Sequence, residues 1–368
     1  MKRVLVFSLA YFPRIGGAEV AVKEITDRIP DLEFHMVTLR FGVDDALVEK
    51  VGNVFVYRIG SGSYLSKIFF VPRAALAGVR LHRAHHFDGM WAVMSYMLFP
   101  VVLMRFLGVR LPYVLTLQEG DTYEHMYRRL RVLPFLPLIN YGFRNATVVQ
   151  AISTFLGEWA RRRGFKGSLQ IIPNGVDVKK FTGSPVSHNG VVLITASRLV
   201  RKNAIDDVIR ALPFLPQEIR FVVLGTGPDA EVLKNLAQKL GVSHRVEWKG
   251  FVDHAALPQH LHAADIFIRP SRSEGMGNSF IEAMAAGVPV IATQEGGLAD
   301  FIFDEKTAFV VEKDSPHQIL QKVEEILGNP ELVKKVVNNA CTLALEKYDW
   351  GLVARAMREQ VFARLFAV

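Results

Sequence analysis

Short apolar runs rich in Val and Ile alternate along the chain with stretches whose apolar positions recur every three or four residues. The runs predict buried strands, and the stretches between them predict helices. The expected strands of the first half are 3–10, 34–39, 53–59, 113–118 and 146–152. Those of the second half are 191–197, 220–225, 245–251, 266–271, 289–293 and 308–312. This alternation predicts an α/β protein with two parallel sheets and crossover helices.

A polar stretch rich in Gly, Ser and Pro, residues 181–190, separates the two series and is the expected linker. With 368 residues the chain is longer than a single core usually allows. We therefore predict an N-terminal domain over 1–183 and a C-terminal domain over 184–345. A last helix, 346–368, either closes the second domain or crosses back to the first.

Two apolar segments have other conceivable roles. Residues 1–10 resemble a signal peptide, but no small-residue cleavage site follows, which favours a buried first strand. Residues 89–104 are short for a membrane span and contain Pro100, which favours buried helices covering a sheet. The single cysteine, Cys341, excludes an internal disulfide framework and fits a reducing compartment, so we expect a cytoplasmic protein.

Charge is uneven along the chain. Residues 1–183 contain 24 Lys and Arg against 14 Asp and Glu, whereas the remainder contains 20 against 22. The cationic half favours an anionic partner. The sequence contains no recognisable nucleic-acid-binding motif, which argues against a nucleic acid as that partner. Residues 126–145 mix arginines with large apolar residues, and 158–166 add further cations. They predict peripheral docking on an anionic membrane, with a solvated basic face as the alternative.

The most informative stretch joins an expected strand, 266–271, to an expected helix. A loop at the carboxyl end of a parallel strand is where ligands bind in open α/β sheets, and a helix start favours phosphate. Gly275 and Gly277 let the backbone approach such a ligand closely. The alternative is a capping box made by Ser279 and Glu282, which leaves both glycines unexplained.

Two further loops have candidate phosphate ligands. Arg198, Arg201 and Lys202 directly follow a strand and can clamp a diphosphate through charge-assisted bonds, although a solvated basic loop is the alternative. Gly16 and Gly17 precede an expected helix, whose start can face phosphate; a tight strand-to-helix turn is the alternative reading.

Together these motifs resemble the family-4 retaining glycosyltransferases of GT-B architecture. Glu274 and Glu282 match the E-x7-E signature of that family. Similar segments occur at 11–19, 171–177, 197–203, 225–242, 250–252, 263–271 and 294–302. The resemblance implies two Rossmann-like domains that face a central cleft. It also implies transfer of a hexose from a nucleotide-diphosphate sugar, with retention of configuration, to a saccharide or lipid-linked acceptor.

The resemblance also implies roles for single residues. Glu274 would contact the donor sugar and Glu282 the ribose, while Arg198 would hold the diphosphate. Lys202 stands one position before the usual lysine of the family. The remaining implied donor contacts are Gly16, Gly17, Asn174, Gly225, Gly250, Phe251, Val252, Met276, Gly277, Asn278 and Ser279. No cofactor is implied beyond a UDP-, GDP- or ADP-linked donor, and no D-x-D motif suggests a metal.

One departure from the family affects the acceptor side. Gln118 stands where many relatives have a histidine, and Asp121, which lies close by, is a candidate catalytic residue that would compensate for that histidine. Glutamine can hydrogen-bond a sugar hydroxyl but cannot act as a general base. The departing phosphate would then take the acceptor's proton.

Three other classes of protein have weaker support. The paired glutamates of the E-x7-E signature, Glu274 and Glu282, argue against a GT-B sugar-nucleotide epimerase. A Rossmann oxidoreductase would need G-x-G-x-x-G after the first strand, where residues 11–19 stand instead. A non-catalytic carbohydrate- or membrane-binding scaffold is suggested only by Gln118.

Overall fold

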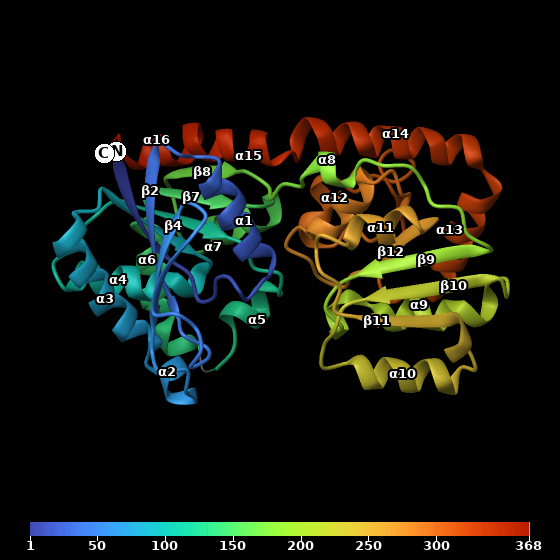
Figure 1. Ribbon diagram of the computed structural model, residues 1–368, viewed down its shortest axis with the longest axis horizontal. Coiled ribbons are helices and arrows are strands. Elements are labelled where there is room, and N and C mark those ends of the chain that lie inside the picture. The colour runs from blue at the N-terminus through green and yellow to red at the C-terminus, as the bar shows by residue number, and fades with distance from the viewer. Residues whose placement is uncertain (131, 368) are drawn as a thin grey trace. The chain divides into compact units, whose positions relative to one another are not determined.

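The computed structural model describes residues 1–130 and 132–367, so Arg131 of the predicted basic segment and Val368 of the last predicted helix lie outside it. The chain forms two compact units, shown in Figure 1. The first unit consists of Met1–Asn174 together with Trp350–Val368, and the second consists of Gly175–Asp349.

The first unit is built on a sheet with the strand order β3-β4-β2-β1-β5-β6-β7-β8. Every neighbouring pair is parallel except β3 and β4, which are antiparallel. The strands are β1 (Lys2–Phe7), β2 (Leu32–Leu39), β3 (Val48–Val51), β4 (Val54–Ile59), β5 (Gly89–Val93), β6 (Tyr113–Leu117), β7 (Val148–Ala151) and β8 (Ser168–Ile171). Most are short apolar runs buried on both faces, as parallel strands between helices require.

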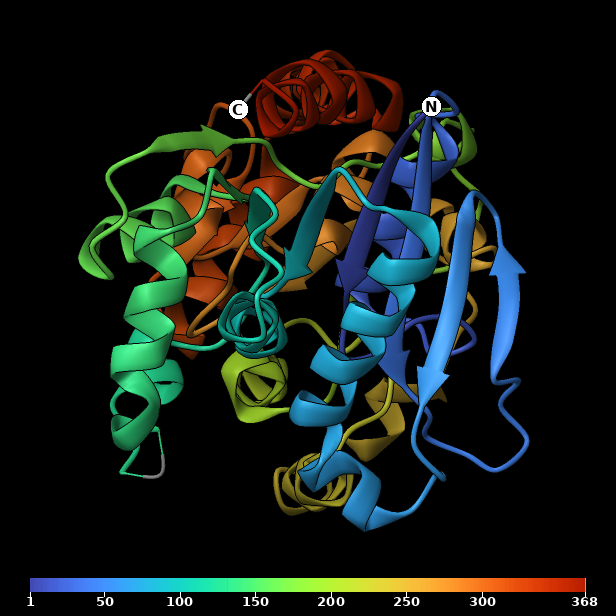
Figure 2. The ribbon, with the colours of Figure 1, turned by 90° about the vertical axis from the view of Figure 1, so that its left-hand side faces the viewer.

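Helices cover both faces of this sheet. Figure 2 shows α3, α4 and α6 over one face. The helical segments are α1 (Gly17–Asp27), α2 (Tyr64–Ile68), α3 (Phe70–His85), η1 (Ser95–Met97), α4 (Leu98–Phe106), α5 (Tyr123–Tyr127), η2 (Leu133–Phe135), α6 (Leu136–Arg144), α7 (Thr154–Arg162), α15 (Trp350–Ala356), η7 (Met357–Phe362) and α16 (Ala363–Leu365). The described residues contain no helix that is long and apolar enough to cross a membrane.

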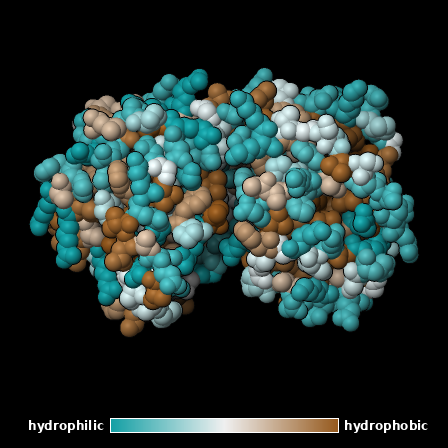
Figure 3. All heavy atoms as spheres, in the orientation of Figure 1, coloured by the Kyte–Doolittle hydropathy of each residue, from teal (hydrophilic) through white to brown (hydrophobic). Residues whose placement is uncertain are grey.

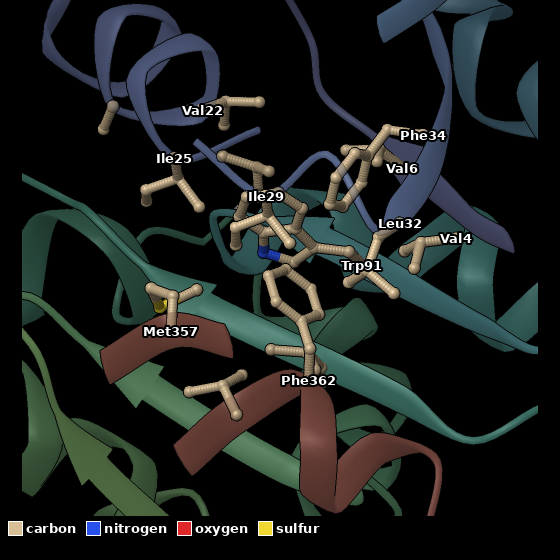
Figure 4. Close-up of a cluster of buried hydrophobic side chains, with 14 of the residues drawn as sticks. Val4, Val6, Val22, Ile25, Ile29, Leu32, Phe34, Trp91, Met357 and Phe362 are labelled. Carbon is tan, nitrogen blue, oxygen red and sulfur yellow. The ribbon is translucent and has the colours of Figure 1, made fainter. Parts of the chain in front are cut away.

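The end of the chain belongs to the core of the first unit. Phe362 lies against Trp91 and Phe34, with ring centroids 5.2 and 5.6 Å away (Figure 4). α15 packs on α1, and Val361 is fully buried in the same cluster. Of the two roles predicted for the last helix, the structure therefore shows the return to the first unit.

Val361→Ala is expected to lower the free energy of unfolding by about 2 kcal/mol, because it removes two buried methyl groups and leaves a cavity. Chemical denaturation measures the change. Gln360→Ala, at an exposed position on the same turn, is the control and should change stability by less than about 0.5 kcal/mol. Equal effects of the two substitutions would contradict the assigned packing.

The second unit has a parallel sheet with the order β11-β10-β9-β12-β13-β14. Its strands are β9 (Val191–Ala196), β10 (Ile219–Leu224), β11 (Val246–Gly250), β12 (Ile266–Arg269), β13 (Val290–Ala292) and β14 (Phe309–Val310). Its helical segments are α8 (Val178–Phe181), η3 (Arg201–Asn203), α9 (Ile205–Ala211), η4 (Leu212–Phe214), α10 (Ala230–Lys239), η5 (Ser243–Arg245), α11 (Leu257–His262), α12 (Asn278–Ala285), η6 (Gly296–Asp300), α13 (Pro316–Gly328) and α14 (Pro330–Lys347).

The unit boundaries differ from those expected from the sequence. The first lies at 174/175 and not at 183/184, because α8 packs on α12 of the second unit and buries Phe181 there. The predicted linker 181–190 is therefore part of the second unit. The last boundary lies at 349/350, after the end of α14, and not at 345/346.

The prediction of helices throughout residues 89–104 was wrong. This apolar segment contains the strand β5, the short turn η1 and most of α4. The strand ends at Val93, and the next residue, Met94, turns the chain with a φ of 70°. Pro100 fits within the first turn of α4, where no amide donor is needed. The strands β3 and β8 were also not predicted.

Candidate functional site

The predicted donor-binding residues of the second unit lie at the carboxyl ends of its parallel strands, in the loops that follow them and in the helix α12, because these strand ends meet at one edge of the sheet. Two of these loops pack closely. The amide of Gly225, after β10, donates to the carbonyl of Gly250 at 2.7 Å. Gly225 has a φ of 130°, and a Cβ there would collide with the carbonyl of Ser197 after β9. Glycine is therefore required at Gly225 by both conformation and space.

The loop from β12 to α12 is organised around Arg269, the last residue of β12. Its Nη2 donates to Oε2 of Glu274 at 3.0 Å, and its Nη1 donates to Oγ of Ser279 at 3.0 Å. Nη1 also donates to the carbonyl of Ala196, at the end of β9, at 3.2 Å. The guanidinium lies 4.2 Å from the ring centroid of Phe280. One buried cation thus joins the neighbouring strand, the loop and the start of the helix.

The second glutamate of the signature has a different partner. Glu282 is buried, and its Oε1 lies 2.8 Å from Nε2 of His254. Gly277, with a φ of 82°, is the residue that precedes α12, and no side chain caps this helix start. The capping box considered for Ser279 and Glu282 is therefore not formed.

Arg269 was missed by the sequence analysis, although a charge within the apolar run 266–271 is an available signal. Its side chain is 6% exposed, and that of Glu274 is 12% exposed. Burial lowers the pKa of Arg269, while the negative charges of Glu274 and Glu282 act the other way. The two acids therefore lie around one buried positive charge, which fixes the position of Glu274 before any ligand arrives.

The backbone of the cationic loop after β9 is held in place by hydrogen bonds from two residues, Asn203 and Arg272. Nδ2 of Asn203 donates to the carbonyl of Arg198 at 2.6 Å. Arg272 donates from its amide to the carbonyl of Lys202 at 2.7 Å, and from Nη1 to the carbonyl of Arg201 at 2.8 Å. The side chain of Arg198 is exposed and that of Lys202 is half-buried. The loop thus presents Arg198 from a fixed main chain.

Arg272 is itself anchored by carboxylates. It binds Asp206, Asp207 and Asp314 in ion pairs of 2.8, 2.8 and 2.5 Å. Burial, followed by the charge of Asp206, raises the pKa of Asp207 from 3.8 to about 6. Arg272 therefore has a structural role in holding the loop.

The pKa of Asp207 predicts a pH dependence of stability. Because its pKa is higher in the folded chain than in the unfolded one, the folded state binds more protons between about pH 4 and 6, and stability falls as the pH rises through this window. Asp207→Asn removes this titration. Relative to the parent, the variant should gain about 1 to 2 kcal/mol across the window, measured by denaturation at several pH values. A difference between the two proteins that is independent of pH would contradict the assignment.

The first unit carries the remaining predicted residues. Gly16 precedes α1, and Gly17 is its first residue. A Cβ on Gly16 would lie 2.6 Å from Oε2 of Glu19, so this carboxyl group lies at the helix start. Burial raises the pKa of Glu19. Any phosphate at this helix start would therefore meet the side chain of Glu19 as well as the backbone amides.

The structure brings Gln118 and Asn174 together, since Nδ2 of Asn174 donates to Oε1 of Gln118 at 3.3 Å. Glu119, next to Gln118, is buried, and its Oε1 accepts from the amide of Ser95 at 2.6 Å. Burial raises the pKa of Glu119. Asp121 is exposed and lies in the segment between β6 and α5.

The predicted site residues thus form two groups, one on each unit. Those on the first unit are Gly16, Gly17, Gln118, Asp121 and Asn174. Those on the second unit are Arg198, Lys202, Gly225, Gly250, Phe251, Val252, Glu274, Met276, Gly277, Asn278, Ser279 and Glu282. Phe251 is 72% exposed, so its ring has an open face. Among residues 1–130 and 132–367, no group of three or more His, Cys, Asp or Glu side chains is arranged to hold a metal ion.

Two parallel-sheet α/β units of this kind define the GT-B class of folds. A sucrose-phosphate synthase from Thermosynechococcus elongatus has a similar structure, with a TM-score of 0.86 over 100% of both chains at 21% identity. A family model described as Glycosyltransferase Family 4 matches residues 15–180, and one described as Glycosyl transferases group 1 matches residues 179–342. The chain belongs to the family-4 glycosyltransferases.

Curated relatives agree with this assignment. An uncharacterized glycosyltransferase of Methanocaldococcus jannaschii is 24% identical over 352 residues, which are 95% of each chain. A GDP-mannose-dependent alpha-(1-6)-phosphatidylinositol monomannoside mannosyltransferase of Mycolicibacterium smegmatis is 29% identical over 254 residues, which are 62% of this chain and 66% of the relative. The predicted GT-B fold and family are confirmed.

Proposed function

We propose that the protein transfers a hexose from a nucleotide-diphosphate sugar to a lipid-linked or saccharide acceptor, with retention of anomeric configuration and without a metal ion. The observation that carries the proposal is the loop in which Arg269 holds Glu274 at a strand end beside a helix start. The family assignment supports the reaction class. The relative from Mycolicibacterium smegmatis, a phosphatidylinositol monomannoside mannosyltransferase, supports a lipid-linked acceptor.

Breaking the anomeric C–O bond generates an oxocarbenium-like sugar and a negatively charged nucleotide diphosphate. Arg198 and the amides at the start of α12 would stabilise the charge on the leaving diphosphate. Glu274, fixed by Arg269, would bind the hexose, and Glu282, beside His254, would bind the ribose. Since Gln118 cannot take a proton, the departing phosphate would accept the proton of the acceptor hydroxyl.

A transfer assay tests this proposal. The purified protein is incubated with UDP-glucose, GDP-mannose or ADP-glucose and a lipid extract, in buffer with and without EDTA. We expect one donor to give a glycolipid whose anomeric configuration, read by NMR, is that of the donor, with an equal rate in EDTA. Inversion would contradict retention, and loss of activity in EDTA would contradict metal independence. Binding of a carbohydrate without turnover of any donor would favour the non-catalytic scaffold.

A further inference from the structure

A large cavity in the first unit has no role in the donor site. It has a volume of about 670 Å³ and is lined by residues of α2, α3, α4, α5 and α6 and of the segments between them. This volume is within the range of pockets that hold a ligand of drug size or larger, about 300 to 1,000 Å³. The cavity lies wholly within one compact unit.

Most of the cavity wall is hydrocarbon. Val71, Phe99, Leu103 and Leu138 contribute to its lining from three helices. Phe99 stands between two other aromatic side chains that also line the cavity, with ring centroids 5.6 Å from Tyr96 and 5.9 Å from Phe135. A wall of this kind favours an apolar ligand, because burying apolar surface there is what gives affinity.

The apolar surface continues outside the cavity. Ile68, Tyr96 and Phe135 line it and are 55%, 40% and 53% exposed. On α2, next to Ile68, Tyr64 and Leu65 are 76% and 62% exposed. Figure 3 shows hydrophobic side chains gathered on this unit near α2. A group of large apolar side chains that are exposed next to a cavity favours an interaction site.

One side of the cavity is polar and charged. Asp121, His125 and Arg129 follow one another at intervals of four residues, in α5 and the segments on either side of it, and all line the cavity. Nδ1 of His125 lies 2.6 Å from Nη2 of Arg129, and Nε2 of His125 lies 3.8 Å from Oδ2 of Asp121. Lys67 and Arg128 lie on the segments beside it, and both are exposed. Cations beside an apolar cavity complement a ligand with an anionic head and an apolar tail.

We propose that this cavity holds an acyl chain of an anionic glycerophospholipid, with the headgroup beside Arg129. The exposed side chains of α2 and η2 then lie among neighbouring lipids at the membrane surface. That the bound lipid is also the sugar acceptor rests on the proposed function. The binding of the lipid itself does not depend on any reaction.

The test uses monomeric dihexanoylphosphatidylglycerol and dihexanoylphosphatidylcholine, titrated into the full-length protein by calorimetry. We expect phosphatidylglycerol to bind several-fold more tightly than phosphatidylcholine. Val71→Trp, which fills the cavity, should weaken binding of phosphatidylglycerol at least tenfold. Leu76→Trp, on the same helix α3 but outside the lining and 50% exposed, is the matched control and should bind as the parent does. Arg129→Gln should remove the preference for phosphatidylglycerol.

Three results would overturn this assignment. They are no binding of either lipid by the parent, unchanged binding by Val71→Trp, and equal binding of the two lipids. Leu138→Trp, which fills the cavity from α6, replaces Val71→Trp if that variant does not fold. Lipid binding without turnover of any nucleotide sugar would reject the proposed function and leave the cavity assignment in place. Turnover of a nucleotide sugar with no lipid binding would reject the cavity assignment and leave the proposed function in place.

Discussion

Glu274→Gln is expected to lower kcat for sugar transfer by a factor of about 100 to 1,000, the usual cost of removing one preorganised electrostatic contact. The amide has nearly the same shape and keeps an oxygen that can accept from Arg269. It lacks the negative charge that balances the buried guanidinium of Arg269. In the proposed reaction this charge would also stabilise the positively charged, oxocarbenium-like transition state. The chemical step should therefore suffer more than substrate binding, and KM should change less than kcat.

The structure offers a matched control for this variant. Glu295→Gln changes an acid in the loop after β13, where Glu295 pairs at the surface with Lys313 at 3.1 Å. Its kcat should remain within about twofold of the parent, because an exposed ion pair contributes little. If Glu274→Gln retained kcat within threefold while its fold was intact, the assignment of Glu274 to the reacting sugar would be wrong.

Arg198→Ala is expected to weaken the binding of the nucleoside diphosphate by a factor of about 10 to 150, which corresponds to the loss of one hydrogen bond to a charged group. The fold should be unaffected, because the side chain is exposed and the loop is held through the carbonyl of Arg198 by Asn203. Calorimetric titration with the diphosphate measures the change.

A second arginine of the same unit controls for a general effect of charge. Arg210 is exposed on α9, and Arg210→Ala removes an equal charge. We expect its affinity for the diphosphate to stay within about twofold of the parent, because the charge of an exposed side chain that does not contact the ligand contributes little in water. Equal losses in the two variants would mean that net charge, and no specific clamp, attracts the nucleotide.

Much of the fold was predictable because parallel strands covered on both faces are apolar throughout, and helices between them show a different period. The failure at residues 89–104 has a physical cause. Between the apolar residues of β5 and those of α4 the only side chain that is clearly polar is that of Ser95, and the chain turns at Met94, which is not a typical turn residue. Hydrophobicity alone cannot divide such a segment.

The candidate site was predictable only in part. The spacing of Glu274 and Glu282 indicated the loop, and the glycines indicated close approach of the backbone. The partners of the two acids could not be read from this spacing. His254 stands 28 residues before Glu282, and only the packing of the loop after β11 on α12 brings them together. The binding roles of these residues stay predictions.

The most direct test of the central claim, that the second unit binds a nucleotide-diphosphate sugar, is thermal unfolding of the protein with UDP, GDP or ADP. A ligand that binds only the folded state adds about 2.7 kcal/mol of stability at a hundredfold excess over Kd. We predict that one of the three nucleotides raises Tm and that Arg198→Ala removes most of this rise. No change in Tm with any of the three would contradict the proposed donor site.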